Sequence, residues 1–367
     1  MDFRLTEEQA MLRDTLSRYL ADRDPLDARL KRRSRQPRGD AALWRALATD
    51  LGIVGAALPE EAGGMGGGAI ETMVVMDALG EALATVPYLS AVVLAGGVLK
   101  QETAVLAQVA DGSLLLALAA LEAESRHCWH AVATRAVRDG DDWRIDGAKA
   151  VVLGAPDAAT LVVSARTSGD VRDRDGVSLF LVDAAAVTRH DYRLIDGTPA
   201  SDVVLDGAHG ALVGDPGGAT PLLEAAGDAA VAATVAEAAG VARRMLADTV
   251  EWTKQRKQFG QALAGFQVLQ HRMVDMYMAA EQIQSAAYLA TLNLDAAPDQ
   301  RARAISAAKA VTAEALRFVA QNAVQLHGAM GLTDELAVGH YFKRATAIEQ
   351  QFGAADHHLK RYAALAA

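Results

Sequence analysis

The long helical pattern that follows Gly218 constrains the fold of this chain more than any other feature. Leu222 to Phe259 is a nearly unbroken run of residues compatible with helix. The next segment places apolar side chains on one helical face, at Phe266, Leu269, Met273, Met276, Tyr277, Ala280, Ile283 and Ala287. Pro298 then breaks the pattern, and a further helix is predicted from about Arg301 to Leu326. Long helices with wide apolar faces indicate a helical bundle that buries part of its surface against another subunit.

The residues before this bundle fall into two further segments. Helical pattern starts at Thr6, a candidate N-cap, and returns at Ala42 to Leu51 and at Ile70 to Leu83. Short β-branched runs bounded by Asp and Gly follow, at Trp143–Ile145, Ala150–Leu153, Thr160–Ser164, Val177–Val182 and Asp202–Leu205. No helical pattern separates them, which favours an antiparallel barrel or sandwich over a parallel sheet. The predicted domains are helical over 1–110, β over 111–215 and a helical bundle over 216–367.

Composition excludes several classes of function. The formal net charge of −10 over 367 residues argues against a nucleic-acid partner, because phosphate binding needs excess Lys and Arg. Cys128 is the single cysteine, so no intrachain disulfide and no cysteine metal cluster can form, as suits a reducing cytoplasm. The first residues lack the basic start and apolar run of a secretory signal. The apolar run Leu114–Leu121 is far shorter than the ~20 residues that cross a bilayer, so no membrane span is expected.

Two local features have competing interpretations. The basic cluster between Arg29 and Arg38 suits a solvated loop better than an anion site. The glycine run Gly63–Gly68 has no following Lys-Ser or Lys-Thr and no preceding strand pattern. A tight connection between helices is therefore favoured there over a phosphate loop.

Three motifs, in this order along the chain, are more specific. They are Asp146-Gly147-Ala148-Lys149 leading to Leu161-Val162-Val163; Arg256-Lys257-Gln258-Phe259-Gly260 followed by Phe266-Gln267; and Gln325-Leu326-His327-Gly328-Ala329-Met330-Gly331. With these motifs the chain resembles the acyl-CoA dehydrogenase family over nearly its full length. The resemblance implies a mainly α fold with a central β domain: an N-terminal helical domain, a middle antiparallel β barrel and a C-terminal four-helix bundle. It also implies FAD as cofactor.

The last two motifs make physical sense as a dinucleotide site. Arg256 offers a fork of donors to a pyrophosphate, and Phe259 offers a flat face. Gln267 and Gln325 supply amide groups, and Gly328, beside Ala329, lets a backbone approach closely. An arginine and a phenylalanine at a helix end also serve as a surface cap and a core anchor. The resemblance implies that these positions reach across a subunit interface. There they hold the adenosine-diphosphate half of an FAD that is bound mainly by the neighbouring subunit.

The flavin half of the site departs from the family pattern. Where the family presents Thr-Glu-Pro and then Gly-Ser-Asp over the flavin, this chain has Leu121-Glu122-Ala123-Glu124-Ser125-Arg126. Where the family places an aromatic residue and Thr or Ser against the ring, this chain has Val151, Val152 and Leu153. The polar contacts to the ring are therefore expected to be missing.

The family reaction needs a carboxylate base that takes the α-proton of a thioester while the β-hydrogen leaves as hydride to the flavin. The usual base position falls on Phe352, and the position that a minority of members use falls on Ala230; neither accepts a proton. Glu349 is a weak alternative base, and Asp228 and Asp356 are the other nearby carboxylates. The adjacent His357 and His358 are expected on a solvated face rather than in a metal site, and no metal is predicted.

The losses fall on this subunit's own site, whereas the residues lent to a neighbour remain. The chain therefore resembles the small, base-lacking subunits of two-component acyl-CoA dehydrogenases, such as the pimeloyl-CoA dehydrogenase small subunit. The implied partners are a base-bearing acyl-CoA dehydrogenase homologue, an acyl-CoA substrate and an electron-transfer flavoprotein. One alternative is a homo-oligomeric enzyme that uses a carboxylate such as Glu349. Another is a flavin-free acyl-CoA-binding or scaffold protein.

Overall fold

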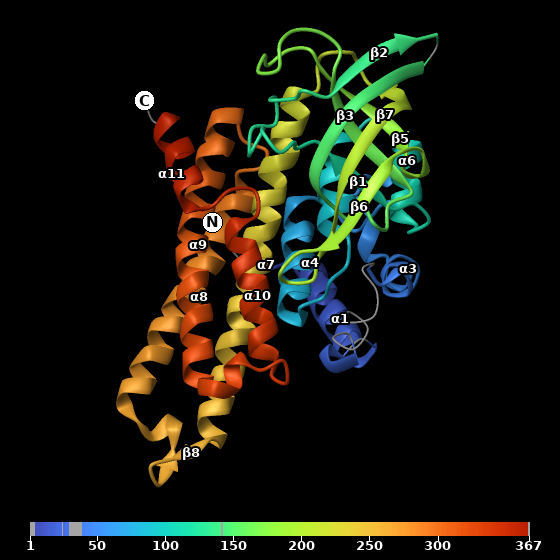
Figure 1. Ribbon diagram of the computed structural model, residues 1–367. Helices are drawn as coiled ribbons and strands as arrows, with labels where there is room; N and C mark the ends of the chain where they lie inside the picture. The colour runs from blue at the N-terminus through green and yellow to red at the C-terminus, as the bar shows by residue number, and fades with distance from the viewer. Residues whose placement is uncertain (1–3, 24, 29–38, 141, 366–367) are drawn as a thin grey trace. The chain divides into compact units, whose positions relative to one another are not determined.

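The computed structural model describes residues 4–23, 25–28, 39–140 and 142–365 and forms two compact units. One unit comprises Met1–Arg29, Ala69–Ala84 and Val231–Ala367, and the other comprises Leu30–Gly68 and Thr85–Ala230. Helix α1 (Glu7–Arg23, dark blue in Figure 1) and the last helices (red) thus belong to one unit although they come from opposite ends of the sequence. The predicted three-domain division stays a prediction, and the cluster at 29–38 lies outside the described residues.

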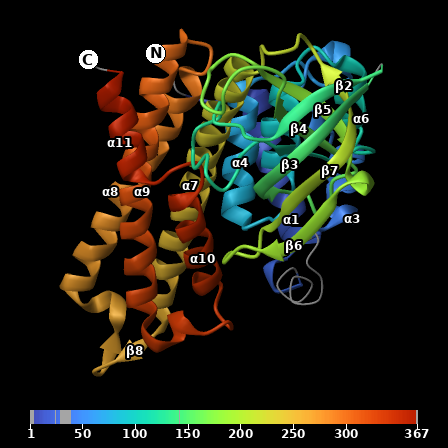
Figure 2. The same cartoon turned by 45° about the horizontal axis from the view of Figure 1, so that its top comes forward.

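Long helices that lie side by side build the first unit. In both views α8, α9 and α10 run alongside α7 (Figures 1 and 2). Their bounds are α7 Thr220–Gln255, α8 Gln267–Leu292, α9 Pro298–His327 and α10 Ala337–Gln350; α1 Glu7–Arg23, α4 Ala69–Ala82 and α11 Ala355–Ala364 complete the set. Met245, Met276, Ile283, Leu316 and Tyr341 are among the side chains buried between these helices. The bundle predicted after Gly218 is confirmed.

Among the described helices, α7 is long and apolar enough to cross a membrane by length and composition alone. However, 89% of the stretch that meets this test is buried inside the protein. A helix that is apolar all round and buried is typical of a protein core. The apolar run Leu114–Leu121 contains the short buried strand β1 (Leu116–Ala119).

The second unit is built on a seven-stranded sheet that closes on itself through a pairing between β4 and β5. The remaining strands are β2 Arg135–Asp139, β3 Asp142–Leu153, β4 Thr160–Arg166, β5 Val177–Asp183, β6 Thr188–Arg193 and β7 Pro199–Val213. The two runs predicted at Trp143–Ile145 and Ala150–Leu153 form one strand, β3, whose register against β7 shifts twice. Such bulges bend a strand, which explains why the sequence pattern looked interrupted.

The predicted antiparallel β barrel is confirmed, with parallel pairing only at β4 among the described strands. β1 pairs with β4 in parallel, and β2 also meets β4 in parallel, whereas the other pairs are antiparallel. All four residues of β1 are buried, as is typical of parallel strands, and no hairpin leads into it. Its continuous apolar pattern therefore carried no alternation that could mark it as a strand.

Shorter helical elements accompany the sheet. They are α3 Ala41–Thr49, η1 Ile53–Gly55, η2 Glu60–Ala62, the π-helix η3 Tyr88–Ala95, α5 Gly96–Val98, α6 Thr103–Ala110 and η4 Ala184–Ala186. The glycine run forms the tight connection that the sequence predicts, between η2 and α4, with φ of 72° at Gly63 and 71° at Gly66. These left-handed angles suit glycine.

Candidate functional site

The residues predicted to bind the cofactor lie at one end of the helical unit, where α7 ends, α8 begins and α9 ends. Two contacts join these helix ends: the Trp252 ring stacks on the His327 ring at 5.1 Å, and the Thr253 hydroxyl contacts the Met273 sulfur at 3.4 Å. The predicted residues are all exposed on this chain: Arg256, Phe259, Gln267, Gln325, Gly328 and Ala329. We call these six residues the clamp. Its side chains are therefore available to something outside the chain.

Phe259 is held in a strained and exposed position within the clamp. Together with Gly260 it forms the turn between β8 (Lys257–Gln258) and β9 (Gln261–Ala262), with φ of 52° and 83°. Turns of this kind favour Asn-Gly, and the left-handed conformation costs a bulky residue about 1 kcal/mol. The ring is 89% exposed and meets the Phe266 ring edge to face, with ring centroids 6.2 Å apart. The strained backbone at Phe259 gains no compensating burial of the ring within this chain. We therefore interpret Phe259 as a residue that binds a ligand or another chain.

Gly328 ends α9 in a conformation that other residues avoid, with φ of 63° and ψ of −145°. A Cβ built on it would meet nothing within 4 Å. The glycine is therefore required by its backbone angles and not by crowding from this chain. It leaves the start of η6 (Gly328–Leu332) open to close approach by a ligand.

Sequence analysis missed the stack that supports the clamp. His327 is 7% exposed, its Nδ1 lies 2.7 Å from the Ala323 carbonyl oxygen, and burial lowers its pKa. The indole nitrogen of Trp252 is buried and has no hydrogen-bond partner among the described residues. His327 stood inside a recognised motif, but a stack between α7 and α9 has no signal in the sequence.

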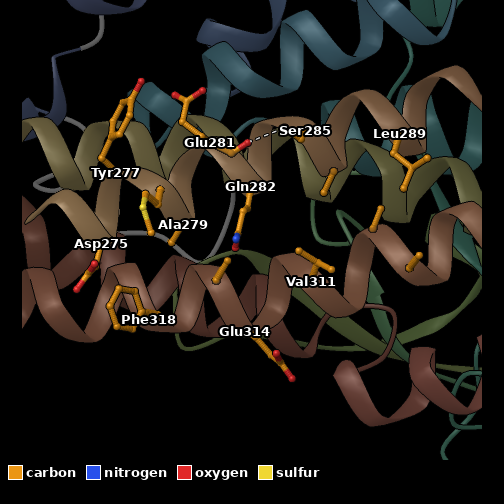
Figure 3. A pocket seen from close by; sticks show the side chains of 15 residues that line it. Asp275, Tyr277, Ala279, Glu281, Gln282, Ser285, Leu289, Val311, Glu314 and Phe318 are labelled. Atoms are coloured by element: carbon orange, nitrogen blue, oxygen red, sulfur yellow. Dashed lines mark hydrogen bonds between the residues drawn. The ribbon is translucent and has the colours of Figure 1, made fainter. Parts of the chain in front are cut away.

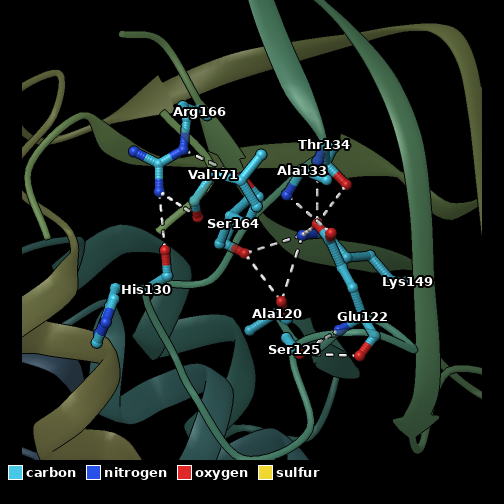
Figure 4. A network of polar contacts seen from close by, with 11 residues as sticks. Ala120, Glu122, Ser125, His130, Ala133, Thr134, Lys149, Ser164, Arg166 and Val171 are labelled. Atoms are coloured by element: carbon cyan, nitrogen blue, oxygen red, sulfur yellow. Dashed lines mark hydrogen bonds and ion pairs between the residues drawn. The ribbon is translucent and has the colours of Figure 1, made fainter. Parts of the chain in front are cut away.

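In the other unit, the segment that would cover a flavin is fixed by a buried ion pair (Figure 4). The Lys149 ammonium group is fully buried and donates to the Glu122 carboxylate at 2.7 Å, and also to the Ser164 hydroxyl and the Ala120 carbonyl oxygen. The same carboxylate accepts from the Ala133 and Thr134 amides and the Thr134 hydroxyl at 2.7 to 3.0 Å. Burial lowers the pKa of Lys149 to about 8, although Glu122 opposes that shift.

The polar groups of this segment form hydrogen bonds within the protein. The Ser125 hydroxyl donates to the Glu122 carbonyl oxygen and accepts from its amide, both at 2.8 Å, and the side chain is 6% exposed. Arg126, next to it, is exposed and has a φ of 51°. Neither Ser125 nor Glu122 is free to contact a cofactor or a substrate in this arrangement.

Arg166 is a second organiser of the same region that the sequence did not reveal. Its guanidinium donates to six backbone carbonyl oxygens, those of His130, Val132, Ser168, Val171, Asp173 and Asp175 (Figure 4 shows the His130 and Val171 contacts). The side chain is 1% exposed. It therefore ties the segment after Cys128 to the loop between β4 and β5.

The residues predicted to face the flavin ring lie on the bulge in β3. Val151 is 50% exposed and has a φ of 53°, which is an outlier for a β-branched residue. Its amide donates to the Asp202 carboxylate at 3.0 Å. Val152 points into the core of the sheet and is 2% exposed. The bulge thus presents an apolar side chain at the position that the sequence predicts to lie against the flavin ring.

Phe352 stands at the position where the sequence predicts that the base is lost. Phe352 lies between α10 and α11 with a φ of 60°, and its carbonyl oxygen lies 3.1 Å from His358 Nε2. Lys309, 1% exposed on α9, donates to the Ile348 carbonyl oxygen. Ala230 is fully buried in α7. The backbone from Ile348 to Phe352 is therefore held at both ends by hydrogen bonds. The Phe352 side chain itself cannot accept a proton.

The carboxylate at Glu349 is engaged elsewhere. It forms a two-point ion pair with Arg317 of α9, one contact of which measures 3.0 Å. A carboxylate whose two oxygens both accept from a guanidinium is turned toward that partner. This geometry does not favour Glu349 as a base.

The expectation that His357 and His358 lie on a solvated face is wrong for His358. Helix α11 turns that ring inward, where it is 1% exposed and lies 3.5 Å from the Ser306 hydroxyl. Its neighbour His357 meets it edge to face. Adjacent residues on a helix point about 100° apart, which accounts for one buried ring beside a half-buried one.

His358 should make stability depend on pH. Burial, together with His357 and Lys309, lowers its pKa from 6.5 to about 3. Between these values the unfolded chain binds a proton that the folded chain does not, so stability falls as the pH falls from 6.5. His358→Gln should reduce that slope by up to about 1.4 kcal/mol per pH unit, measured by urea unfolding between pH 4.5 and 6.5. Equal slopes for the two proteins would contradict the assignment.

Comparisons with known proteins identify the family. The N-terminal, middle and C-terminal domain models of acyl-CoA dehydrogenase match residues 6–113, 117–208 and 229–365. The chain is 31% identical to acyl-CoA dehydrogenase IpdE2 of Mycobacterium tuberculosis, over 92% of this chain and 91% of that protein.

Two solved structures are similar over nearly the whole chain. The Tcur3481-Tcur3483 steroid ACAD G363A variant is 30% identical, with a TM-score of 0.88 and 98% of each chain covered. The ChsE4-ChsE5 complex from Mycobacterium tuberculosis is 26% identical, with the same TM-score, and covers 99% of this chain and 98% of that one.

Proposed function

Because the chain belongs to the acyl-CoA dehydrogenase family, whose members are FAD-binding flavoproteins, we propose that it is the base-lacking subunit of a two-component acyl-CoA dehydrogenase. One observation carries the proposal: the clamp is exposed and strained, whereas Phe352 and Val151 stand where this chain would need polar groups. The chain thus lends the clamp to a partner's FAD and takes no proton itself.

The residues of the clamp fit the adenosine-diphosphate half of FAD. The guanidinium of Arg256 would hold the pyrophosphate, the Phe259 face would cover an apolar part, and Gln267 and Gln325 would supply amide groups beside Gly328 and Ala329. Bound FAD supplies a hydride acceptor for α,β-desaturation of an acyl-CoA thioester. The base that removes the α-proton belongs to the partner.

The partner is a base-bearing acyl-CoA dehydrogenase homologue, and the assembly is a cytoplasmic heterotetramer. The ChsE4-ChsE5 complex supports this, because its name describes an assembly of two components. The word steroid in the name of the Tcur3481-Tcur3483 structure makes ring-bearing acyl-CoA esters the first substrates to test, beside fatty acyl-CoA. An electron-transfer flavoprotein would reoxidise the flavin.

The experiment that tests the proposal measures the visible spectrum and the FAD content of the purified chain, alone and after co-expression with a base-bearing acyl-CoA dehydrogenase homologue from the same organism. We expect a colourless chain alone and a yellow complex with about one FAD per pair. A yellow chain that acyl-CoA reduces by itself would overturn it. A complex that stays colourless would favour the flavin-free acyl-CoA-binding or scaffold alternative.

The homo-oligomeric alternative uses a carboxylate such as Glu349 as its base. Because Arg317 holds both carboxylate oxygens, Glu349→Gln should leave kcat of the complex within about twofold and lower stability by about 1 kcal/mol or less, as for other partly exposed pairs. Initial rates with acyl-CoA and a dye acceptor measure this. A drop of a thousandfold in kcat would make Glu349 the base and contradict the proposed role.

A further inference from the structure

A cysteine and a histidine lie side by side in the unit that contains the sheet. Cys128, the single cysteine of the chain, is partly exposed, and its Sγ lies 3.3 Å from Nε2 of His130. A thiol within reach of an imidazole is the pairing that activates cysteine nucleophiles. The groove of about 1260 Å³ along α8 and α9 (Figure 3) has no such pair, because its described lining residues include neither cysteine nor histidine.

A carboxylate lies on the other side of the His130 ring. Nδ1 of His130 is 3.8 Å from one oxygen of Glu224, near the start of α7. The other Glu224 oxygen accepts from Arg174 at 2.8 Å. The carboxylate favours the tautomer of His130 that carries its proton on Nδ1, which leaves the Nε2 lone pair facing the Cys128 thiol. Glu224 thus orients the base, as the third member of a nucleophile–base–carboxylate arrangement does.

The charge state of His130 suits a base. Burial and the Arg174 charge lower the pKa of the imidazole, although Glu224 opposes this shift. The ring is therefore neutral near pH 7 and can accept the thiol proton. The Arg174 guanidinium also interacts electrostatically with Cys128, so it would stabilise the negative charge that the sulfur takes on in a reaction.

The segment that carries the pair is fixed by two contacts. Arg166 donates to the His130 carbonyl oxygen at 2.8 Å, and the ring of His130 points away from this contact (Figure 4). The Trp129 indole lies against Gly227 of α7, where an added Cβ would come within 2.5 Å of the indole. Gly227 stands about one helical turn after Glu224, so Trp129 docks the segment beside the carboxylate. The three side chains are therefore held in place and not left to a mobile loop.

The arrangement does not suit a metal ion. The sulfur of Cys128 and the carboxylate of Glu224 face different nitrogens of His130, so the three groups do not converge on one point. No group of three His, Cys, Asp or Glu side chains in the described part of the chain could hold a metal. The thiol is instead placed to act as a nucleophile.

We propose that Cys128 is a site of reversible covalent modification, at which the thiolate formed with the help of His130 and Glu224 exchanges with a small disulfide. The thiol proton passes to His130 Nε2, and the Cys128 sulfur attacks one sulfur of the disulfide. A new S–S bond forms, the original S–S bond breaks, and the leaving thiolate takes the proton back from His130. The disulfide is the oxidant and ends as one free thiol and one mixed disulfide on Cys128. No FAD, acyl-CoA or partner subunit takes part, so the inference is independent of the proposed function.

The single cysteine makes the test specific, because every reacting thiol is Cys128. The full chain is mixed with dithiodipyridine, an aromatic disulfide, and the absorbance of the released thione gives the rate between pH 6 and 9.5. His130→Gln should react roughly 100-fold more slowly at pH 7, because glutamine cannot accept the proton. At pH 9.5 the two rates should converge, since an ordinary thiol, with a pKa near 8.5, ionises there without a base. A purely structural role of His130 would not produce this convergence.

Two further variants isolate the base and its carboxylate. Glu224→Gln keeps the size of the side chain but loses its charge, so it should also slow the reaction at pH 7, by less than His130→Gln does. His127→Gln is the matched control, because His127 is exposed and stands next to Cys128 in the sequence, and it should react at the wild-type rate. Circular dichroism checks that each variant is folded.

Glutathione disulfide tests the modification itself. Mass spectrometry of the intact chain should find one glutathione per chain, which a reducing agent removes, and none on Cys128→Ser. Three results would overturn the proposal: a His130→Gln variant as reactive as the wild type at pH 7, a wild-type chain no faster at pH 7 than the same chain unfolded in urea, or a chain that glutathione disulfide leaves unmodified. The last two do not depend on any variant folding.

Discussion

Replacing Arg256 with alanine should remove most FAD from the heteromeric complex without dissociating the two chains. The guanidinium is the single strong cation of the clamp, and a charge-assisted hydrogen bond contributes about 1.5 to 3 kcal/mol. The FAD dissociation constant should therefore rise by roughly 10- to 100-fold. Absorbance of the complex after gel filtration, with titration of free FAD, measures the change.

A matched control is available two residues earlier, in the last turn of α7. Lys254 is exposed in the last turn of α7 and contacts Glu251 at 3.8 Å, so Lys254→Ala removes a nearby positive charge but no clamp residue. We expect it to retain FAD. If the two alanine variants lose FAD equally, general electrostatic attraction and not the Arg256 fork holds the cofactor. If neither loses it, the clamp assignment fails.

Glu122→Ala should be the most destabilising single substitution in the β unit, by about 3 to 5 kcal/mol at pH 6. Removing one partner of a buried ion pair leaves the other charge uncompensated, and here the Thr134 and Ala133 amides also lose their acceptor. Burial holds the folded-state pKa of Lys149 near 8, below its ordinary 10.5, and Glu122 opposes this shift. Without Glu122 the pKa falls further.

The sign of the pH dependence follows from this shift. A folded-state pKa below the unfolded value means that the unfolded chain binds the extra proton, so stability rises with pH. In Glu122→Ala this rise begins at a lower pH than in wild type, and the difference between the two proteins should shrink as the pH approaches 8. Urea unfolding at pH 6 and at pH 8.5 tests this.

Two further variants isolate the ion pair. Glu124→Ala removes an exposed carboxylate two residues away and should change stability by less than about 0.5 kcal/mol. Adding Lys149→Met to Glu122→Gln removes both charges and should recover part of the lost stability, as buried pairs replaced by apolar groups do. A double variant as unstable as the sum of the singles would show that the two side chains act independently.

The helical parts of the fold could be predicted because long helices repeat their apolar residues at a regular spacing. The bundle after Gly218 and the helix near Ala69–Ala82 came from the spacing of apolar residues. β1 could not be found in the same way, because a strand buried on both faces has no alternation. β6 was missed because its residues are polar and none of them is buried, so it has no apolar residues that could mark a strand.

Only those site residues that lie in short sequence motifs could be predicted. Arg256 and Phe259 are predicted from one local motif, and Phe352 is predicted from a separate motif that carries the base in the family. The contacts that hold the site together join residues far apart in sequence. Arg166 reaches loops on both sides of it, and His358 folds back onto Phe352, so neither role leaves a mark in the local pattern.

The anchored backbone around Phe352 bears on how such a chain diverges. The Ile348 and Phe352 carbonyl oxygens are held by Lys309 and His358, so the shape of the segment does not depend on which side chain stands at 352. Under the proposed function, an ancestor could exchange its carboxylate for a phenyl ring without refolding the loop. The base is then lost by a single substitution that leaves the backbone unchanged, and the reverse substitution could restore a carboxylate at 352. Restoring activity would also require polar contacts to the flavin ring in place of the apolar bulge at Val151.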